Sequence, residues 1–130
     1  MTMVERLTRC IVGWCVVWER TEAVAQALVD AAPQAVLYFS DDFSTYSTLI
    51  YTPGIHIAMT DKSQTYSVEG DNAELRHYLA RLARRSRCFS RSIQALERAV
   101  KLFVFAWNRR QLYQQRYPAY PAHVMDFVYP

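Results

Sequence analysis

The sequence predicts a small α/β domain, and three observations carry that prediction. Residues 9–18 and residues 35–39 are apolar at both odd and even positions, which is typical of strands covered on both faces. Residues 22–32 lie between these runs and have the apolar periodicity of a helix. Strand, helix and strand in this order predict two parallel strands joined by a right-handed crossover. At 130 residues, the chain is long enough for one domain with a small core.

The first helix and the second strand are defined by the residues at their ends. Thr21 precedes the helical segment and can cap its amino terminus, and Pro33 follows its last turn. The second strand stops at Ser40-Asp41-Asp42. Acidic residues at the carboxyl end of a parallel strand lie where α/β proteins commonly place their active sites. Asp41 is therefore a candidate functional residue.

Residues 43–59 predict a short helix, a turn and a third strand. The short helix is expected within residues 43–51, and Thr52-Pro53-Gly54 forms a turn. Residues 55–59 read IHIAM and predict a short strand. The expected sheet therefore has about three short strands, with parallel pairs among them.

A single long helix is predicted over residues 66–91. Four apolar residues form a stripe along it: Leu75, Tyr78, Leu79 and Leu82. A polar line beside this stripe begins at Glu69 and continues through Asn72 and Arg76. The helix is thus expected to have one buried side and one polar side that begins with a carboxylate.

Arginines make the outer edge of this helix strongly basic. Six of them follow one another: Arg76, Arg81, Arg84, Arg85, Arg87 and Arg91. No acidic residue lies between Glu74 and Glu97, whereas a helix built for solubility mixes both signs of charge. Several guanidinium groups in a row suit a phosphate backbone. The alternative is an amphipathic helix whose charged side is only solvated.

The last predicted helix starts after Ser90 or Ser92, either of which can cap it. Its apolar residues follow i, i+3, i+4 spacing: Ile93, Leu96, Val100, Phe103, Val104 and Trp107. The end of this helix is basic, and residues 117–121 predict an extended, peripheral segment. We therefore expect a domain over residues 1–116 and a C-terminal tail over residues 117–130.

Composition places the chain among globular proteins, because 52% of its residues are hydrophobic and 21% are charged. The formal net charge is only +3, but acids cluster before Glu74 and arginines after it. Cys10, Cys15 and Cys88 have no CxxC spacing and the histidines have no ligand spacing, so neither a disulfide framework nor a zinc site is expected. Free thiols predict a reducing cytoplasm, and no signal peptide or membrane-spanning run is found in the sequence.

Asp41 and Glu69 are candidate ligands for a divalent cation. Asp41 ends a predicted strand and Glu69 begins a predicted helix, and a fold that brings them together would offer hard oxygen ligands. Each residue also has a structural alternative. An aspartate at a strand end commonly forms a turn, and a glutamate in a first helical turn stabilises the helix dipole. Spacing alone leaves both interpretations open.

Two segments, VLYFSDDFSTY and TYSVEGDNAELRHYLARLARRSRCFSRS, resemble the catalytic region of bacterial transposases of the insertion sequence one family. The similarity runs from roughly residue 9 to residue 110, and WERTEAVAQAL resembles the family's junction between a strand and a helix. Its most specific part is the signature E-x-x-N-x-x-x-R-x-x-L-A-R-L-x-R-x-(S/T), which begins at Glu69.

The resemblance implies a DDE-type transposase with a ribonuclease H-like fold. In that family two aspartates and a glutamate bind Mg²⁺ or Mn²⁺, activate water to cut DNA at the element ends, and support strand transfer. The second aspartate corresponds to Asp41 and the glutamate to Glu69. Asn72 would support Glu69, and Arg76 would either pair with Glu69 or contact the scissile phosphate. The arginines that follow would bind DNA.

The resemblance also implies that this chain corresponds to the C-terminal half of a transposase. The family's first catalytic aspartate, its zinc ribbon and its helix-turn-helix region correspond to segments upstream of Met1. We therefore expect a truncated ribonuclease H-like fold that does not cleave DNA alone. Residues 9–18 would form an unpaired apolar edge strand that favours self-association or pairing with an upstream transposase half.

Three functions are consistent with the sequence. The first is that of a catalytic transposase fragment. The second is that of a DNA-binding or transposase-binding fragment that modulates transposition. The third alternative is an inactive remnant. The expected partners are the DNA of the element ends and of the target, with no membrane. The expected location is the cytoplasm, in association with the nucleoid.

Overall fold

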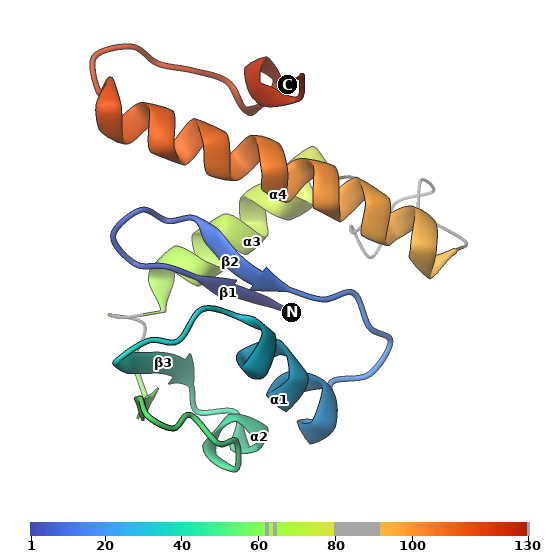
Figure 1. Ribbon diagram of the computed structural model, residues 1–130, viewed down its shortest axis with the longest axis vertical. Coiled ribbons are helices and arrows are strands. Elements are labelled where there is room, and N and C mark those ends of the chain that lie inside the picture. Colours follow the sequence, from blue (N-terminus) through green and yellow to red (C-terminus); the bar gives the residue numbers. More distant parts are fainter. Residues whose placement is uncertain (62, 64, 80–91, 130) are drawn as a thin grey trace.

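The structure is a computed structural model that describes residues 1–61, 63, 65–79 and 92–129. The described residues form a small α/β protein with four strands, four α-helices and one short 3₁₀ helix (Figure 1). Within these residues, no helix combines the length and the apolar character that crossing a membrane requires.

Two separate two-stranded sheets take the place of the single sheet that the sequence predicts. Strand β1, Thr2–Val4, pairs antiparallel with β2, Ile11–Trp14. Strand β3, Leu37–Asp41, pairs parallel with β4, Ile55–Met59. The α/β class and the presence of parallel pairing are confirmed, whereas one continuous sheet of three strands is wrong for the described residues.

The prediction of an unpaired edge strand over residues 9–18 is wrong. The strand is limited to β2, and β1 covers one of its edges, with Thr2 opposite Trp14 and Met3 opposite Gly13. The chain reverses between the strands, and Arg9 adopts a left-handed backbone conformation with φ of 59°. The sequence hides this hairpin because β1 has only three residues, too few for a recognisable alternation.

The crossover between residues 9–18 and 35–39 is also corrected, because β2 and β3 belong to different sheets. The parallel connection runs instead from β3 to β4, through α2, Ser44–Ser47, which is shorter than the predicted segment. The predicted turn at Thr52-Pro53-Gly54 is confirmed, because the Gly54 amide donates to the Tyr51 carbonyl over 2.7 Å. A Cβ atom on Gly54 would collide with the Ala35 carbonyl, so glycine is required at this close approach.

The first predicted helix is confirmed as α1, Glu22–Ala31, and the hydroxyl of Thr21 accepts a hydrogen bond from the Val24 amide over 3.3 Å. The last predicted helix is confirmed as α4, Ile93–Arg116, and its cap is Ser92. Helix α4 extends past the predicted basic end by six residues, from Arg110 to Arg116.

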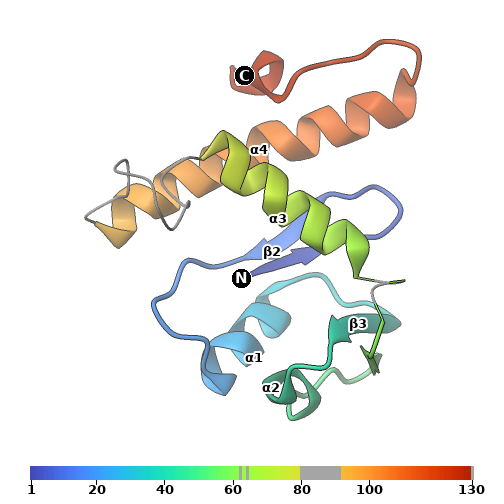
Figure 2. The same cartoon turned by 180° about the vertical axis from the view of Figure 1, so that it is seen from behind.

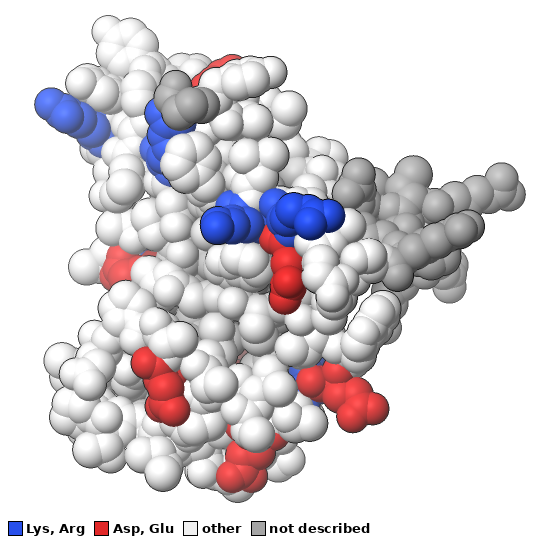
Figure 3. Space-filling view, turned by 45° about the vertical axis from the view of Figure 1, so that its right-hand side comes forward, with Lys and Arg blue, Asp and Glu red and all other residues white. Residues whose placement is uncertain are grey.

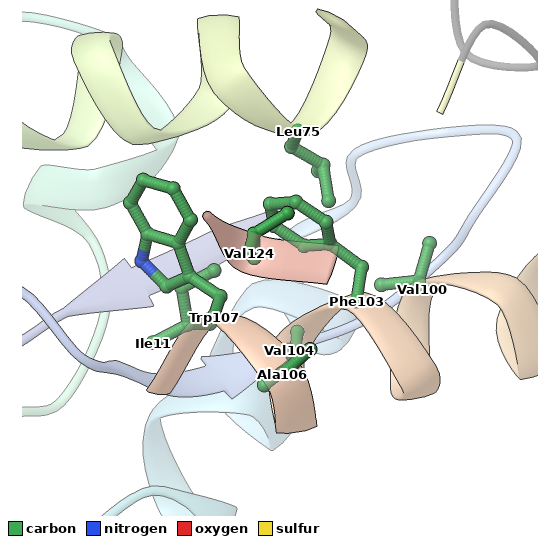
Figure 4. Packing of buried hydrophobic residues seen from close by; sticks show 8 residues of the cluster. All are labelled: Ile11, Leu75, Val100, Phe103, Val104, Ala106, Trp107 and Val124. Atoms are coloured by element: carbon green, nitrogen blue, oxygen red, sulfur yellow. The ribbon is translucent and has the colours of Figure 1, made fainter. Parts of the chain in front are cut away.

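The main core lies between α4, α3 (Tyr66–Tyr78), β2 and the 3₁₀ helix η2 (Val124–Phe127) (Figure 4). Its buried members come from all four elements: Ile11, Leu75, Val100, Phe103, Val104, Ala106, Trp107 and Val124. The predicted apolar sides of the last two helices therefore face the core. Tyr78 and Leu79 also pack against it, whereas Leu82 lies outside the described residues.

The Asn108 side chain of α4 pairs with both backbone polar groups of Ile11 in β2, as a residue of a neighbouring strand would. Its Oδ1 accepts from the Ile11 amide over 2.7 Å, and its Nδ2 donates to the Ile11 carbonyl over 2.8 Å. The Trp107 indole donates to the Arg9 carbonyl over 3.2 Å. These contacts fasten the second strand of the hairpin to the helix that forms most of the core.

The C-terminal residues fold back along α4 (Figures 1 and 2). Arg109 donates to the Tyr129 carbonyl over 2.6 Å, and Arg110 donates to the Ala122 carbonyl over 2.7 Å. Val124 is buried in the core. Residues 117–123 contain neither helix nor strand, but the end of the tail packs on the domain, in contrast to the peripheral tail expected from the sequence. The division at residue 116 stays a prediction.

Candidate functional site

Asp41 is the last residue of β3, and its side chain is exposed. It lies opposite Met59, the last residue of β4, so both strands end at the same edge of their sheet. The hydroxyl of the preceding Ser40 donates to the Asp41 carbonyl over 2.8 Å. The carboxylate is therefore held at the end of a paired strand and is open to solvent.

A small polar and aromatic cluster supports the strands next to Asp41. The Ser40 Oγ lies 2.7 Å from His56 Nε2, and the His56 ring stacks on Tyr51 at 4.5 Å with an interplanar angle of 12°. The tautomer of His56 decides which of these two atoms donates the hydrogen bond. Burial lowers the pKa of His56, and burial together with nearby Tyr46 and Tyr38 raises the pKa of Tyr51 to about 12. Sequence reasoning missed this cluster, which only strand pairing assembles.

The lowered pKa of His56 predicts a pH dependence of stability. The unfolded chain binds a proton at His56 more readily than the folded chain, so this histidine stabilises the fold above about pH 6.5. That contribution is lost as pH falls through the lower folded pKa. In urea unfolding between pH 8 and pH 5, the parent chain should lose more stability than His56→Gln. Equal losses in both chains would contradict this role.

Glu69 lies in the first turn of α3 and is exposed. Its amide donates to the Thr65 carbonyl over 3.2 Å. Residues 60–65 join the end of β4 to this helix, so Glu69 follows Met59, the neighbour of Asp41, by ten residues. In the part of the chain that the structure describes, no three His, Cys, Asp or Glu side chains gather closely enough to hold a metal ion. Asp41 and Glu69 are both exposed, and among the described residues they belong to no such group.

The opposite side of α3 contacts the β1–β2 hairpin. Asn72 Oδ1 accepts from the Thr2 hydroxyl over 2.8 Å. Asp71 is 1% exposed, and its Oδ1 binds Arg9 Nη2 over 2.6 Å. Burial raises the pKa of Asp71, and the Arg9 guanidinium opposes that rise. Asp71 and Arg9 were missed by sequence reasoning, because neither residue type nor spacing indicates that a carboxyl within a basic helix is buried.

The basic helix is described only in part. Helix α3 ends at Tyr78, and Leu79 has a non-helical backbone, so the single helix predicted over residues 66–91 is interrupted there. Arg76 is exposed in the last turn of α3. The other predicted DNA contacts lie outside the described residues: Arg81, Arg84, Arg85, Arg87 and Arg91. On the face shown in Figure 3, most Lys and Arg side chains lie in the upper half and most Asp and Glu side chains in the lower half. Uncharged residues separate the basic groups, so the described residues there form no continuous basic surface.

A family model described as IS1 transposase matches residues 2–113. The matched range contains Asp41, Glu69, Asn72 and all six arginines that follow them. No curated protein and no solved structure matches the chain.

Proposed function

The chain belongs to the IS1 transposase family, and from this premise we propose that it supplies Asp41 and Glu69 to a metal-dependent DDE transposase. The enzyme would cut and join the DNA ends of an insertion element. The observation that carries the proposal is the family match over residues 2–113, which includes both carboxylates. Membership alone gives the chain a role in transposition.

The positions of the two carboxylates support this proposal. Asp41 is exposed at the shared carboxyl edge of a parallel strand pair, and Glu69 is exposed at the start of the helix that follows this pair. A strand-borne aspartate and a helix-borne glutamate in this order also support a ribonuclease H-like origin of the fold. The two sheets and α3 would then be part of a larger ribonuclease H-like domain.

The donor chemistry fits Mg²⁺ or Mn²⁺. Both carboxylates offer hard oxygen atoms, and Mg²⁺ in proteins commonly uses one or two carboxylates, several waters and the phosphates of its substrate. Asp41 and Glu69 would hold the ion, which when bound neutralises charge on the phosphodiester and lowers the pKa of water. Asn72 would help to hold α3 in place, because its side-chain oxygen accepts a hydrogen bond from the Thr2 hydroxyl.

The family resemblance implies three carboxylates, and Asp41 and Glu69 correspond to two of them. We therefore propose that a transposase segment bearing the first aspartate completes the site. The test mixes the chain with such a segment and a duplex that carries an element end. We expect nicking that requires Mg²⁺ or Mn²⁺ and stops with EDTA. A folded, DNA-bound mixture that never nicks the duplex would refute the proposal.

A second candidate function is a non-catalytic fragment that binds DNA or a transposase partner, including a second copy of the chain. The arginine series from Arg76 to Arg91 favours it, because phosphate contacts alone give substantial affinity. Either function would bring the chain to DNA in the cytoplasm and associate it with the nucleoid.

Removing three of these arginines should weaken DNA binding in a salt-dependent way. If Arg81, Arg84 and Arg85 each contact one phosphate, their replacement by alanine reduces the log–log salt slope by about 2.7. The measurement is binding to a short duplex at several salt concentrations. A matched control replaces the exposed cations Arg98, Lys101 and Arg116 of α4. Equal slopes for the two triple variants would contradict a specific DNA-binding role.

A further inference from the structure

Two side chains of the β1–β2 hairpin hold consecutive residues of α3. Thr2 of β1 donates its hydroxyl hydrogen to Asn72 over 2.8 Å, and Arg9 binds Asp71 over 2.6 Å. Helix α3 also contacts β1. A Cβ atom on Gly70 would lie 3.2 Å from Arg9 Nη2, so the guanidinium passes close to the helix backbone. The hairpin is therefore bonded to the helix within the turn that contains Glu69.

These contacts between the hairpin and α3 leave the Glu69 side chain accessible to solvent. Residues two positions apart in an α-helix project about 200° from one another, so Glu69 and Asp71 face nearly opposite directions. This agrees with their exposure, because Asp71 is buried and Glu69 is exposed. A contact behind the helix can thus fix the position of Glu69 without covering it.

The Arg9–Asp71 pair is costly for a purely stabilising contact. The Asp71 side chain is 1% exposed and that of Arg9 is 43% exposed. Among the described residues, the buried atoms Asp71 Oδ2 and Arg9 Nε have no hydrogen-bond partner. Taking the Asp71 carboxylate out of water offsets much of its attraction to Arg9, and an apolar pair is often as stable as a buried ion pair or more stable. A charged pair, however, is satisfied in only one arrangement of the two elements. Its distinctive contribution is orientation.

We propose that Arg9 and Asp71 are positioning residues that hold α3 against the hairpin so that Glu69 takes its place beside Asp41. This inference rests on the proposed function of Glu69. It extends that proposal by assigning a role to the hairpin, which contributes no metal ligand of its own.

The test uses the chain reconstituted with an upstream segment that bears the first aspartate. Arg9→Met combined with Asp71→Met replaces the ion pair by an apolar pair, and Arg9→Lys keeps one charged contact. We expect the apolar pair to retain a cooperative unfolding transition but to slow single-turnover nicking by about 10- to 100-fold, as for small misplacements of catalytic groups. Arg9→Lys, made with Asp71 unchanged, should nick at close to the parent rate, because a lysine has to replace only the single contact between Arg9 Nη2 and Asp71 Oδ1.

Thr21→Ala, which removes the cap of α1 and costs about 1 kcal/mol, serves as a control for general destabilisation and should nick at the parent rate. Hydrogen exchange of the chain alone provides an independent readout, in which the apolar pair should increase exchange in α3 but not in α1. If the double variant does not fold, Thr2→Val serves in its place and should slow nicking in the same direction.

The outcomes separate the two proposals. A parent enzyme that does not nick refutes the proposed function, and this inference with it. A parent enzyme that nicks, together with a folded apolar-pair variant that nicks equally fast, overturns the positioning role alone. If Arg9→Lys nicks as slowly as the apolar-pair variant, the positioning role is overturned as well.

Discussion

Replacing Asp41 by asparagine is expected to slow metal-dependent nicking by the reconstituted enzyme by about 10³-fold. A metal ligand of this kind supports several kcal/mol of transition-state stabilisation, and about 4 kcal/mol corresponds to that factor. Asparagine has nearly the same shape as aspartate but removes the charge that a divalent ion requires. Asp41 is exposed at the end of β3, so the substitution leaves the core intact.

The adjacent Asp42 provides a matched control, because it is also exposed and differs by one position. Asp42→Asn should nick within a few-fold of the parent rate. Glu69→Gln should behave like Asp41→Asn, and Glu74→Gln, at another exposed position of α3, should not. Nicking that survives Asp41→Asn, or that is lost equally in Asp42→Asn, would contradict the assignment of the metal ligand. Single-turnover rates on an end-labelled duplex measure each effect.

Replacing Trp107 by alanine is expected to destabilise the fold by about 3–5 kcal/mol. Its side chain is 3% exposed, stacks on Phe103 at a centroid distance of 5.6 Å, and donates to the Arg9 carbonyl. The substitution leaves a large cavity where α4 meets the hairpin, and the Arg9 carbonyl loses its donor. Such a loss is a large part of the stability of a domain of this size.

Urea unfolding followed by circular dichroism measures this change. The matched control is Leu102→Ala on the same helix, whose side chain is 48% exposed and which should cost less than about 1 kcal/mol. Similar losses for the two variants would show that α4 does not form the core as described. A Trp107→Ala chain that no longer folds would agree with the prediction.

Strong local signals made several elements predictable from the sequence. Helix α1 has a threonine cap and a proline after its end, and α4 has a serine cap and a long apolar periodicity. Strand β4 matches the predicted residues because a turn and a polar loop bound it. These features depend on neighbours within a few residues, which a sequence shows directly.

The arrangement of strands could not be predicted in the same way. Strand β1 is three residues long and is stabilised by pairing with β2 and by contact with α3. Without that partner, residues 9–18 suggested a long edge strand and hence self-association. The reversal of the chain near Arg9 depends on a left-handed backbone at a residue type that gives no such signal.

The ligands proposed for the candidate site stay a prediction, and the contacts that support them could not be predicted from the sequence. Residue type, spacing and family resemblance indicate Asp41 and Glu69, and the structure places both at exposed ends of elements. The Arg9–Asp71 contact joins residues 62 positions apart, and Ser40 meets His56 only through the register of β3 and β4. Contacts of this kind follow from tertiary packing, which local patterns do not contain.

The most direct test of the central claim is cleavage of the reconstituted protein by hydroxyl radicals generated at bound Fe²⁺. A ferrous ion in a Mg²⁺ site cuts the polypeptide near its ligands, and the fragment ends locate those ligands. If Asp41 and Glu69 hold one ion, cuts will occur near residue 41 and near residue 69, and Asp41→Asn will remove both sets while Asp42→Asn retains them. Cuts near only one position, or cuts near residue 69 that persist in Asp41→Asn, would contradict a shared metal site.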